Sequence, residues 1–185
     1  MPFPLLRRTR AADTIGSLYG AIVAQARHPA FYSEYGVPDT MDGRFDMIVL
    51  HVALFFRRVR KEPEPVRALG QGVFDRFCAD MEHNFREIGL SDVAIPKEMR
   101  RVGEAYYGRA AAYDRALAAN DQGVLAEALA RNVFTDAEAV DAARLATYVR
   151  AAVDVLARQD SAAFAGSAVS FPAPAAIPAV TPIPV

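Results

Sequence analysis

The chain has 185 residues, with 21 basic and 22 acidic side chains and a formal net charge of -1. This length is enough for one domain with a sizeable core, and the balanced charge gives no reason to expect a specific nucleic-acid partner. A single cysteine excludes an internal disulfide framework and a multi-cysteine zinc site. It is typical of a reducing compartment, so we expect a cytoplasmic protein.

The N-terminus lacks the pattern of a secretory signal, because its arginines follow a very short apolar stretch and no long apolar segment comes next. A helical pattern begins almost at once. Apolar residues recur at steps of three and four from about residue 9 until Pro29, which cannot donate a helical hydrogen bond. We therefore expect a first helix over 9–27 that leaves little room for a targeting peptide.

Residues 31–44 are rich in turn formers, yet they carry the large aromatic side chains of Phe31, Tyr32 and Tyr35. Such a segment either folds into the core or is displayed for a partner. The preferred interpretation is that it folds into the core, although the sequence leaves both open.

Residues 44–61 form the segment around which the chain is expected to fold. Apolar residues occur on nearly every side of a helix drawn over this range, which is typical of a buried helix. Acidic residues precede it and basic residues end it, as the helix dipole favours. Its apolar run of about ten residues is far shorter than the roughly 20 that cross a bilayer.

Further helical patterns follow over 66–89, 96–119, 121–132 and 136–159, and no segment shows the two-residue alternation of a strand. From Ser161 onward the sequence changes to alanine, valine and proline without a charged residue. The sequence thus predicts an all-α fold, with a single compact domain of about six helices over 9–160. A disordered Pro/Ala-rich tail is expected over 161–185.

The common enzyme motifs are absent from the sequence. It contains no glycine-rich phosphate loop, no G-x-S-x-G elbow and no H-E-x-x-H pair, so we expect neither an enzyme nor a metal site nor a bound cofactor. His51 lies within the apolar central segment. A hydrogen-bonded core histidine is the preferred interpretation, with a ligand or a switch as the alternative.

Two basic clusters are candidates for a binding surface. They are Arg57, Arg58, Arg60 and Lys61 at the end of one helix, and Lys97, Arg100, Arg101 and Arg109 along another. Together they would form a patch for phosphates or acidic peptide, whereas apart they would be solvated faces. Tyr106 and Tyr107 must point about 100° apart on a helix, so one can be buried while the other is exposed.

Three stretches carry a family resemblance. Residues 31–54, 86–100 and 105–109 contain Phe-Tyr-Ser-Glu-Tyr-Gly-Val-Pro-Asp-Thr-Met-Asp-Gly-Arg-Phe, Arg-Glu-Ile-Gly-Leu-Ser-Asp-Val-Ala-Ile-Pro and Ala-Tyr-Tyr-Gly-Arg. With these stretches the chain resembles the ubiquinol-cytochrome c chaperone family over about residues 10–158, and the Pro-rich tail falls outside the resemblance.

The resemblance implies an all-helical, non-enzymatic factor that assists assembly of ubiquinol-cytochrome c reductase. Its expected partner is newly made cytochrome b or another subunit of that complex, met at the inner face of the membrane as a peripheral contact. Mitochondrial relatives carry an N-terminal extension and work with a small helical partner near the ribosome, whereas this chain looks like a bacterial-type member.

Aromatic and basic side chains within the family-like stretches are the candidates for the partner surface. They are Tyr32, Tyr35, Arg44, Lys97, Arg100, Tyr107 and Arg109. The alternative function is a helical protein that binds a small ligand or haem, for which His51 and the aromatic segment are the motivation.

Overall fold

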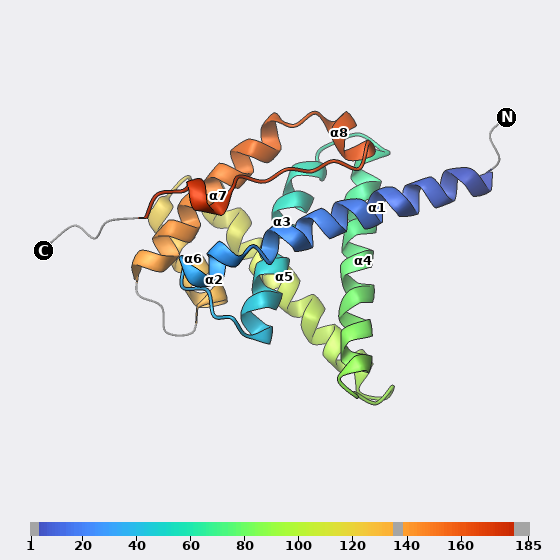
Figure 1. Ribbon diagram of the computed structural model, residues 1–185, viewed down its shortest axis with the longest axis horizontal. Helices are drawn as coiled ribbons and strands as arrows, with labels where there is room; N and C mark the ends of the chain where they lie inside the picture. Colours follow the sequence, from blue (N-terminus) through green and yellow to red (C-terminus); the bar gives the residue numbers. More distant parts are fainter. Residues whose placement is uncertain (1–3, 135–138, 180–185) are drawn as a thin grey trace, which may run out of the picture.

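The computed structural model describes residues 4–134 and 139–179, and within these ranges it contains helices and no strand. Six helices are long: α1 (Pro4–Ala26), α3 (Met41–Val59), α4 (Val66–Glu87), α5 (Ile95–Ala119), α6 (Gln122–Val133) and α7 (Ala139–Arg158). Two short helices, α2 (Pro29–Ser33) and α8 (Ser161–Ala165), and a 3-10 turn, η1 (Pro174–Ala176), complete the fold (Figure 1). The predicted single all-α domain of about six helices is confirmed, while the expected start of the last helix, 136–138, lies outside the described residues.

The central helix is α3, as the apolar pattern predicts. Every residue from Met47 to Phe55 is buried, because α1, α4, α5, α6 and α7 all pack against this helix. Its start is fixed by Thr40, whose side-chain oxygen accepts a hydrogen bond of 3.1 Å from the backbone N–H of Gly43. The start of α3 thus follows from local capping chemistry, while its burial comes from the surrounding helices.

Helices α4 and α5 run side by side and are joined by a turn at residues 88–94. The C-terminal half of α4, this turn and the N-terminal half of α5 form an arm that extends away from the other helices (Figure 1). Gly89 in the turn has a φ of 86°, a left-handed conformation that glycine adopts without steric cost. The tip of the arm carries Val93, which is 90% exposed.

The aromatic segment folds into the core, which confirms the preferred interpretation. Phe31 and Tyr35 are both fully buried. The ring of Phe31 contacts Tyr35, His51 and Tyr148 with ring centroids 5.3, 5.6 and 4.8 Å apart. These edge-to-face contacts fix α2 against the central helix.

The C-terminal segment differs from the expected free tail over residues 161–179. Phe164 of α8 is fully buried against Phe55, with ring centroids 5.5 Å apart. Residues 167–179, which we call the strap, then run back along α1 and α7 without α-helical structure and contain the 3-10 turn η1 (Figure 1). The sequence is apolar and uncharged here because it covers other helices, and residues 180–185 lie outside the described part of the chain.

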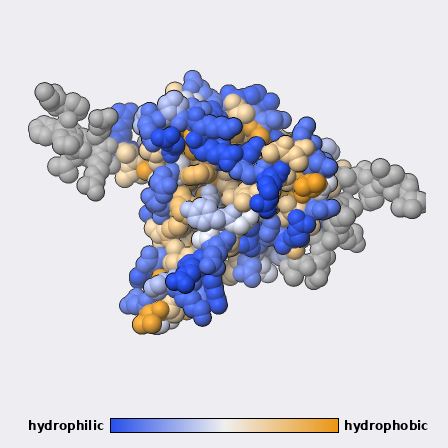
Figure 2. All heavy atoms as spheres, turned by 180° about the vertical axis from the view of Figure 1, so that it is seen from behind, coloured by the Kyte–Doolittle hydropathy of each residue, from blue (hydrophilic) through white to orange (hydrophobic). Residues whose placement is uncertain are grey.

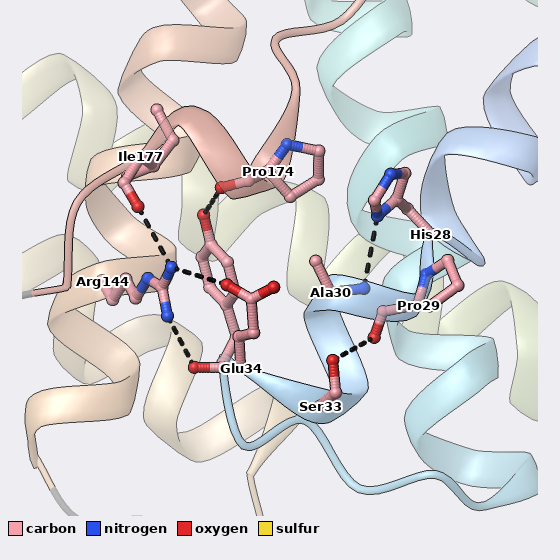
Figure 3. A network of polar contacts seen from close by, with 9 residues as sticks. His28, Pro29, Ala30, Ser33, Glu34, Arg144, Pro174 and Ile177 are labelled. Carbon is pink, nitrogen blue, oxygen red and sulfur yellow. Dashed lines mark hydrogen bonds and ion pairs between the residues drawn. The ribbon is translucent and has the colours of Figure 1, made fainter.

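The strap is held by side chains that reach its backbone carbonyl groups. Arg144 donates to the carbonyl oxygens of Glu34 and Ile177 at 2.7 and 3.1 Å (Figure 3). The hydroxyl of Tyr35 donates to the carbonyl oxygen of Pro174 at 2.7 Å, and Gln25 donates to that of Pro172 at 3.0 Å. Three carbonyl groups of the strap thus receive hydrogen bonds from side chains of α1, of α7 and of the segment after α2.

We expect Tyr35→Phe to lower the free energy of unfolding by about 1 kcal/mol, because the carbonyl of Pro174 loses the buried hydroxyl and keeps only the 3.1 Å bond from the N–H of Ile177. Urea unfolding followed by circular dichroism measures this change. The matched control is Tyr107→Phe, which removes a hydroxyl from a side chain that is 65% exposed and should change nothing. An unchanged stability of Tyr35→Phe would show that the strap is not held through this bond.

Candidate functional site

A groove of about 1110 Å³ lies between the arm and the body of the domain. Its walls come from the first half of α3, the end of α4, the first half of α5 and the end of α6. The apolar part of its lining includes Phe45, Ile48, Met81, Phe85, Val102 and Phe134. Several of these side chains also belong to the core, so the groove opens directly onto the packed interior.

Two large apolar side chains stand at the edge of the groove in contact with solvent. Met41, the first residue of α3, is 73% exposed, and Ile88, directly after α4, is 63% exposed. Apolar residues also gather at the tip of the arm, where they stand among hydrophilic ones (Figure 2). Exposed apolar groups beside an apolar hollow mark a surface that is suited to cover another apolar surface.

The groove is also bordered by charge, with five arginines against three acidic residues. The arginines are Arg27, Arg44, Arg101, Arg109 and Arg131, and the acidic residues are Asp42, Asp46 and Glu98. Arg44 pairs with Asp39 at 2.7 Å and Arg101 pairs with Glu98 at 2.8 Å, both on exposed surface. Exposed pairs of this kind are weak and exchange partners at little cost.

The ion pair between Asp46 and Arg109 lies in the wall of the groove. Their nearest side-chain atoms are 2.7 Å apart, and the Asp46 side chain is almost entirely buried. The alignment of the pair is poor for hydrogen bonding, since Asp46 Oδ1 and Arg109 Nε both lack a well-directed partner in the described structure. Burial therefore raises the pKa of Asp46 to about 6, although the guanidinium of Arg109 acts in the opposite direction.

A smaller hollow of about 470 Å³ adjoins the groove, and Arg27 and Arg44 line both. Tyr32, Ser33 and Asp39 contribute to the small hollow. The hydroxyl of Tyr32 donates to the carbonyl oxygen of Ala26 at 3.0 Å, and the guanidinium of Arg44 lies 6.0 Å from the Tyr32 ring. The two hollows form one continuous surface with arginines at their junction.

The candidate residues from the sequence fall into three places. Arg44 and Arg109 line the groove and Tyr32 lies beside it. Lys97, Arg100 and Tyr107 are exposed on another side of α5. Arg100 and Arg109, for example, are nine residues apart, so their side chains point about 180° apart around the helix.

Tyr35 is fully buried and its hydroxyl is bound to the strap, so its side chain is not part of any surface.

The two basic clusters do not form one patch. Arg57 and Arg60 at the end of α3 both pair with Asp114 in the second half of α5. Lys97 is 17 residues before Asp114, which is about 25 Å along the helix. The sequence left open whether the two clusters form one basic patch or two separate faces, and in the structure they lie on two separate faces.

Sequence reasoning missed several residues of the groove, above all Arg27, Met41, Ile88 and Arg131. The exposure of Met41 and Ile88 depends on where the neighbouring helices end, and no local pattern reports this. Asp46, near the start of α3, is buried and paired with Arg109 from another helix, and the sequence does not reveal this partner. A carboxylate within the apolar pattern of a helix that is expected to be buried is the signal that could have pointed to such a partner.

His51 is a hydrogen-bonded core histidine, as preferred from the sequence. Its Nδ1 lies 2.8 Å from the carbonyl oxygen of Met47, and its Nε2 lies 2.8 Å from the hydroxyl of Tyr148. A carbonyl only accepts, so Nδ1 carries the proton and Nε2 accepts from Tyr148. Burial lowers the pKa of His51 to about 4, and with both nitrogens bonded the structure gives no support to haem ligation by this residue.

No three side chains of histidine, cysteine, aspartate or glutamate come together as metal ligands within 4–134 and 139–179. In the same ranges, no helix combines the length and the apolar character that crossing a bilayer requires.

The chain is similar to proteins of one known family. Residues 33–171 match the family described as ubiquinol-cytochrome C chaperone, so the match continues into the strap. The chain is 25% identical over 117 residues to ubiquinol-cytochrome-c reductase complex assembly factor 1 of Xenopus laevis, covering 63% of this chain and 58% of the relative. The corresponding Mus musculus protein is also 25% identical over 117 residues, which cover 63% of this chain and 39% of the relative.

The chain thus spans about half the length of these curated relatives. The crystal structure of the Cbp3 homolog from Brucella abortus has the same fold. It matches with a TM-score of 0.85 and 37% sequence identity, over 96% of this chain and 100% of that chain. The family match covers most of the chain and confirms the resemblance seen in the sequence: the chain belongs to the ubiquinol-cytochrome C chaperone family.

Proposed function

We propose that this chain is an assembly factor for ubiquinol-cytochrome c reductase and that it binds newly made cytochrome b. Membership of the chaperone family and likeness to reductase assembly factors support a role in the assembly of this complex. The observation that carries the binding role is the groove, with its apolar floor, its exposed Met41 and Ile88 and its border of arginines. The role is that of a binding protein without catalysis, acting at the inner face of the membrane as a peripheral partner.

The transmembrane segments of an unassembled membrane protein are apolar, and they aggregate in water unless another surface covers them. A flexible methionine and exposed isoleucine adapt to different apolar shapes, and arginine is enriched at protein interfaces where it bonds to carboxylates and backbone carbonyls. The groove offers these groups side by side.

The test is a pull-down of tagged protein from gently detergent-solubilised cells, with co-purifying proteins identified by mass spectrometry. We expect the wild type to recover cytochrome b and Arg44→Glu, which reverses a charge at the groove, to lose most of it. Arg100→Glu is the matched control, because it reverses an equally exposed charge on the opposite side of α5 from Arg109.

The outcomes separate the candidate surfaces. Loss of cytochrome b only in Arg100→Glu would move the client to the face of Lys97, Arg100 and Tyr107. Loss of a different protein in Arg100→Glu, such as a small helical partner, would assign that face a second role. Failure to recover any reductase subunit with the wild type, together with normal levels of assembled reductase in a deletion strain, would refute the proposed function.

A further inference from the structure

We propose that the groove binds an amphipathic α-helix of the client, with the apolar side of that helix on the groove floor and its carboxylates against Arg27 and Arg44. This inference rests on the proposed function, since it names the kind of client segment that the site takes. It commits the groove to a helical protein segment, not to lipid and not to an extended peptide.

The lining of the groove favours a helical occupant. An extended peptide exposes a row of N–H and C=O groups, which cost free energy when an apolar surface covers them without partners. A sheet edge would supply those partners, but the described part of this chain has no strand. A helix satisfies its own backbone groups, so its apolar side can lie on Phe45, Phe85 and Phe134 without that cost.

The size of the groove is compatible with a short helix. A helix of about 10 Å diameter that rises 1.5 Å per residue fills roughly 120 Å³ per residue. A volume of about 1110 Å³ therefore corresponds to roughly nine residues, or two to three turns. Met41 on α3 and Ile88 after α4 stand at the edge of this volume, where they can extend the apolar contact along the sides of the bound helix.

The charges around the groove favour carboxylates on the occupant. Arginines outnumber acidic residues among its lining, and Arg27 and Arg44 also line the adjoining small hollow. Arg27 is exposed and forms no ion pair with any described residue. A carboxylate on the client would gain bonds from Arg27 and share Arg44 with Asp39, and such charge-assisted bonds are the stronger ones.

The experiment uses a fluorescein-labelled synthetic peptide of about 15 residues, long enough to form a helix on binding. It carries leucines at helical spacing on one side and glutamates at one end. One comparison peptide has glutamines in place of the glutamates, and a second has the same composition with the leucines spread around the helix. Binding to the full chain is measured by fluorescence anisotropy.

We expect the striped acidic peptide to bind at least about tenfold more tightly than the peptide without the stripe, as anchor contacts in other grooves do. Ile88→Asp should weaken its binding by about the same factor. The matched control is Val93→Asp, which places a charge at an exposed apolar position of the same arm outside the groove and should bind as the wild type does.

The charge contribution has its own test. Arg27→Glu should abolish the preference for glutamate over glutamine, which we expect to be about fivefold at low salt and smaller at high salt. Arg115→Glu, an exposed position on α5 outside the groove, should retain that preference. Both variants alter exposed side chains, so each should unfold at the wild-type temperature.

Several results would overturn the inference. These are equal binding of the striped and unstriped peptides, equal weakening by Val93→Asp and Ile88→Asp, or binding to phosphatidylglycerol vesicles in place of peptide through the same residues. If the wild type recovers cytochrome b while no peptide binds in the groove, the helix inference fails and the proposed function stands. If peptides bind as expected while cytochrome b is never recovered, the groove stands and the proposed client is wrong.

Discussion

Gly43→Ala is expected to lower the free energy of unfolding by more than about 3 kcal/mol, among the largest effects of a single methyl group in this chain. A Cβ at Gly43 would lie 2.1 Å from the backbone oxygen of Pro38. That backbone cannot retreat freely, because the adjacent Val37 is buried and its N–H donates to the carbonyl of Phe31 at 3.1 Å. The first turn of α3 and the segment before it must therefore separate.

Gly103→Ala is the matched control for this substitution. Gly103 lies within α5, and no atom would come within 4 Å of an added Cβ. There the methyl group should raise the free energy of unfolding by about 0.5–1 kcal/mol, since alanine favours a helix over glycine. Urea unfolding of both variants measures the contrast, and a Gly43→Ala protein as stable as the wild type would show that α3 can begin elsewhere.

His51 and Asp46 are expected to give opposite pH dependences of stability. Burial holds the pKa of His51 at about 4, below its ordinary value of 6.5, so the unfolded chain binds its proton more readily. Acidification from pH 6.5 to 4 therefore costs about 3 kcal/mol at this site, at 1.36 kcal/mol per pKa unit. Burial holds the pKa of Asp46 at about 6, above its ordinary value of 3.8, so acidification from pH 6 to 4 returns about 3 kcal/mol.

The two contributions nearly cancel in the wild type, and single variants should separate them. Asp46→Asn should lose stability steeply, relative to the wild type, as the pH falls from 7 to 4. His51→Gln should gain relative stability over the same range, although its stability at pH 7 is lower because it loses a packed ring. Denaturant unfolding at several pH values measures both curves, and curves parallel to that of the wild type would contradict this account. All other titrating groups are common to the three proteins.

The helices could be predicted from the sequence because their signals are local. The apolar positions of the central segment, the stop at Pro29 and the turn at Gly89 each act within a few residues, and the six long helices follow from them. The family resemblance likewise depends on contiguous stretches. It led to the chaperone family without any knowledge of which surface binds.

The groove could not be predicted because it depends on where separate helices end relative to one another. Arg27, Ile88 and Phe134 lie at the ends of three helices, and nothing in their local sequence reports that these ends meet around one hollow. Arg44 and Arg109 were candidates through their residue type, and both line the groove. Tyr35 was a candidate on the same basis but is fully buried, because the sequence of a loop does not show whether its aromatic residue is buried or exposed. Residues 161–179 pack on the domain where a disordered tail was expected, because Pro-rich composition does not reveal which carbonyl groups accept hydrogen bonds from other helices.

The strap also affects how the chain matures during its synthesis. The hydroxyl of Tyr35 bonds to the carbonyl of Pro174, 139 residues later in the chain. At about 5–20 residues per second, a ribosome needs roughly 7 to 28 seconds to make the intervening residues. Throughout that interval α2 lacks its cover, so the N-terminal helices of a nascent chain reach their final packing only after the C-terminal segment has left the ribosome.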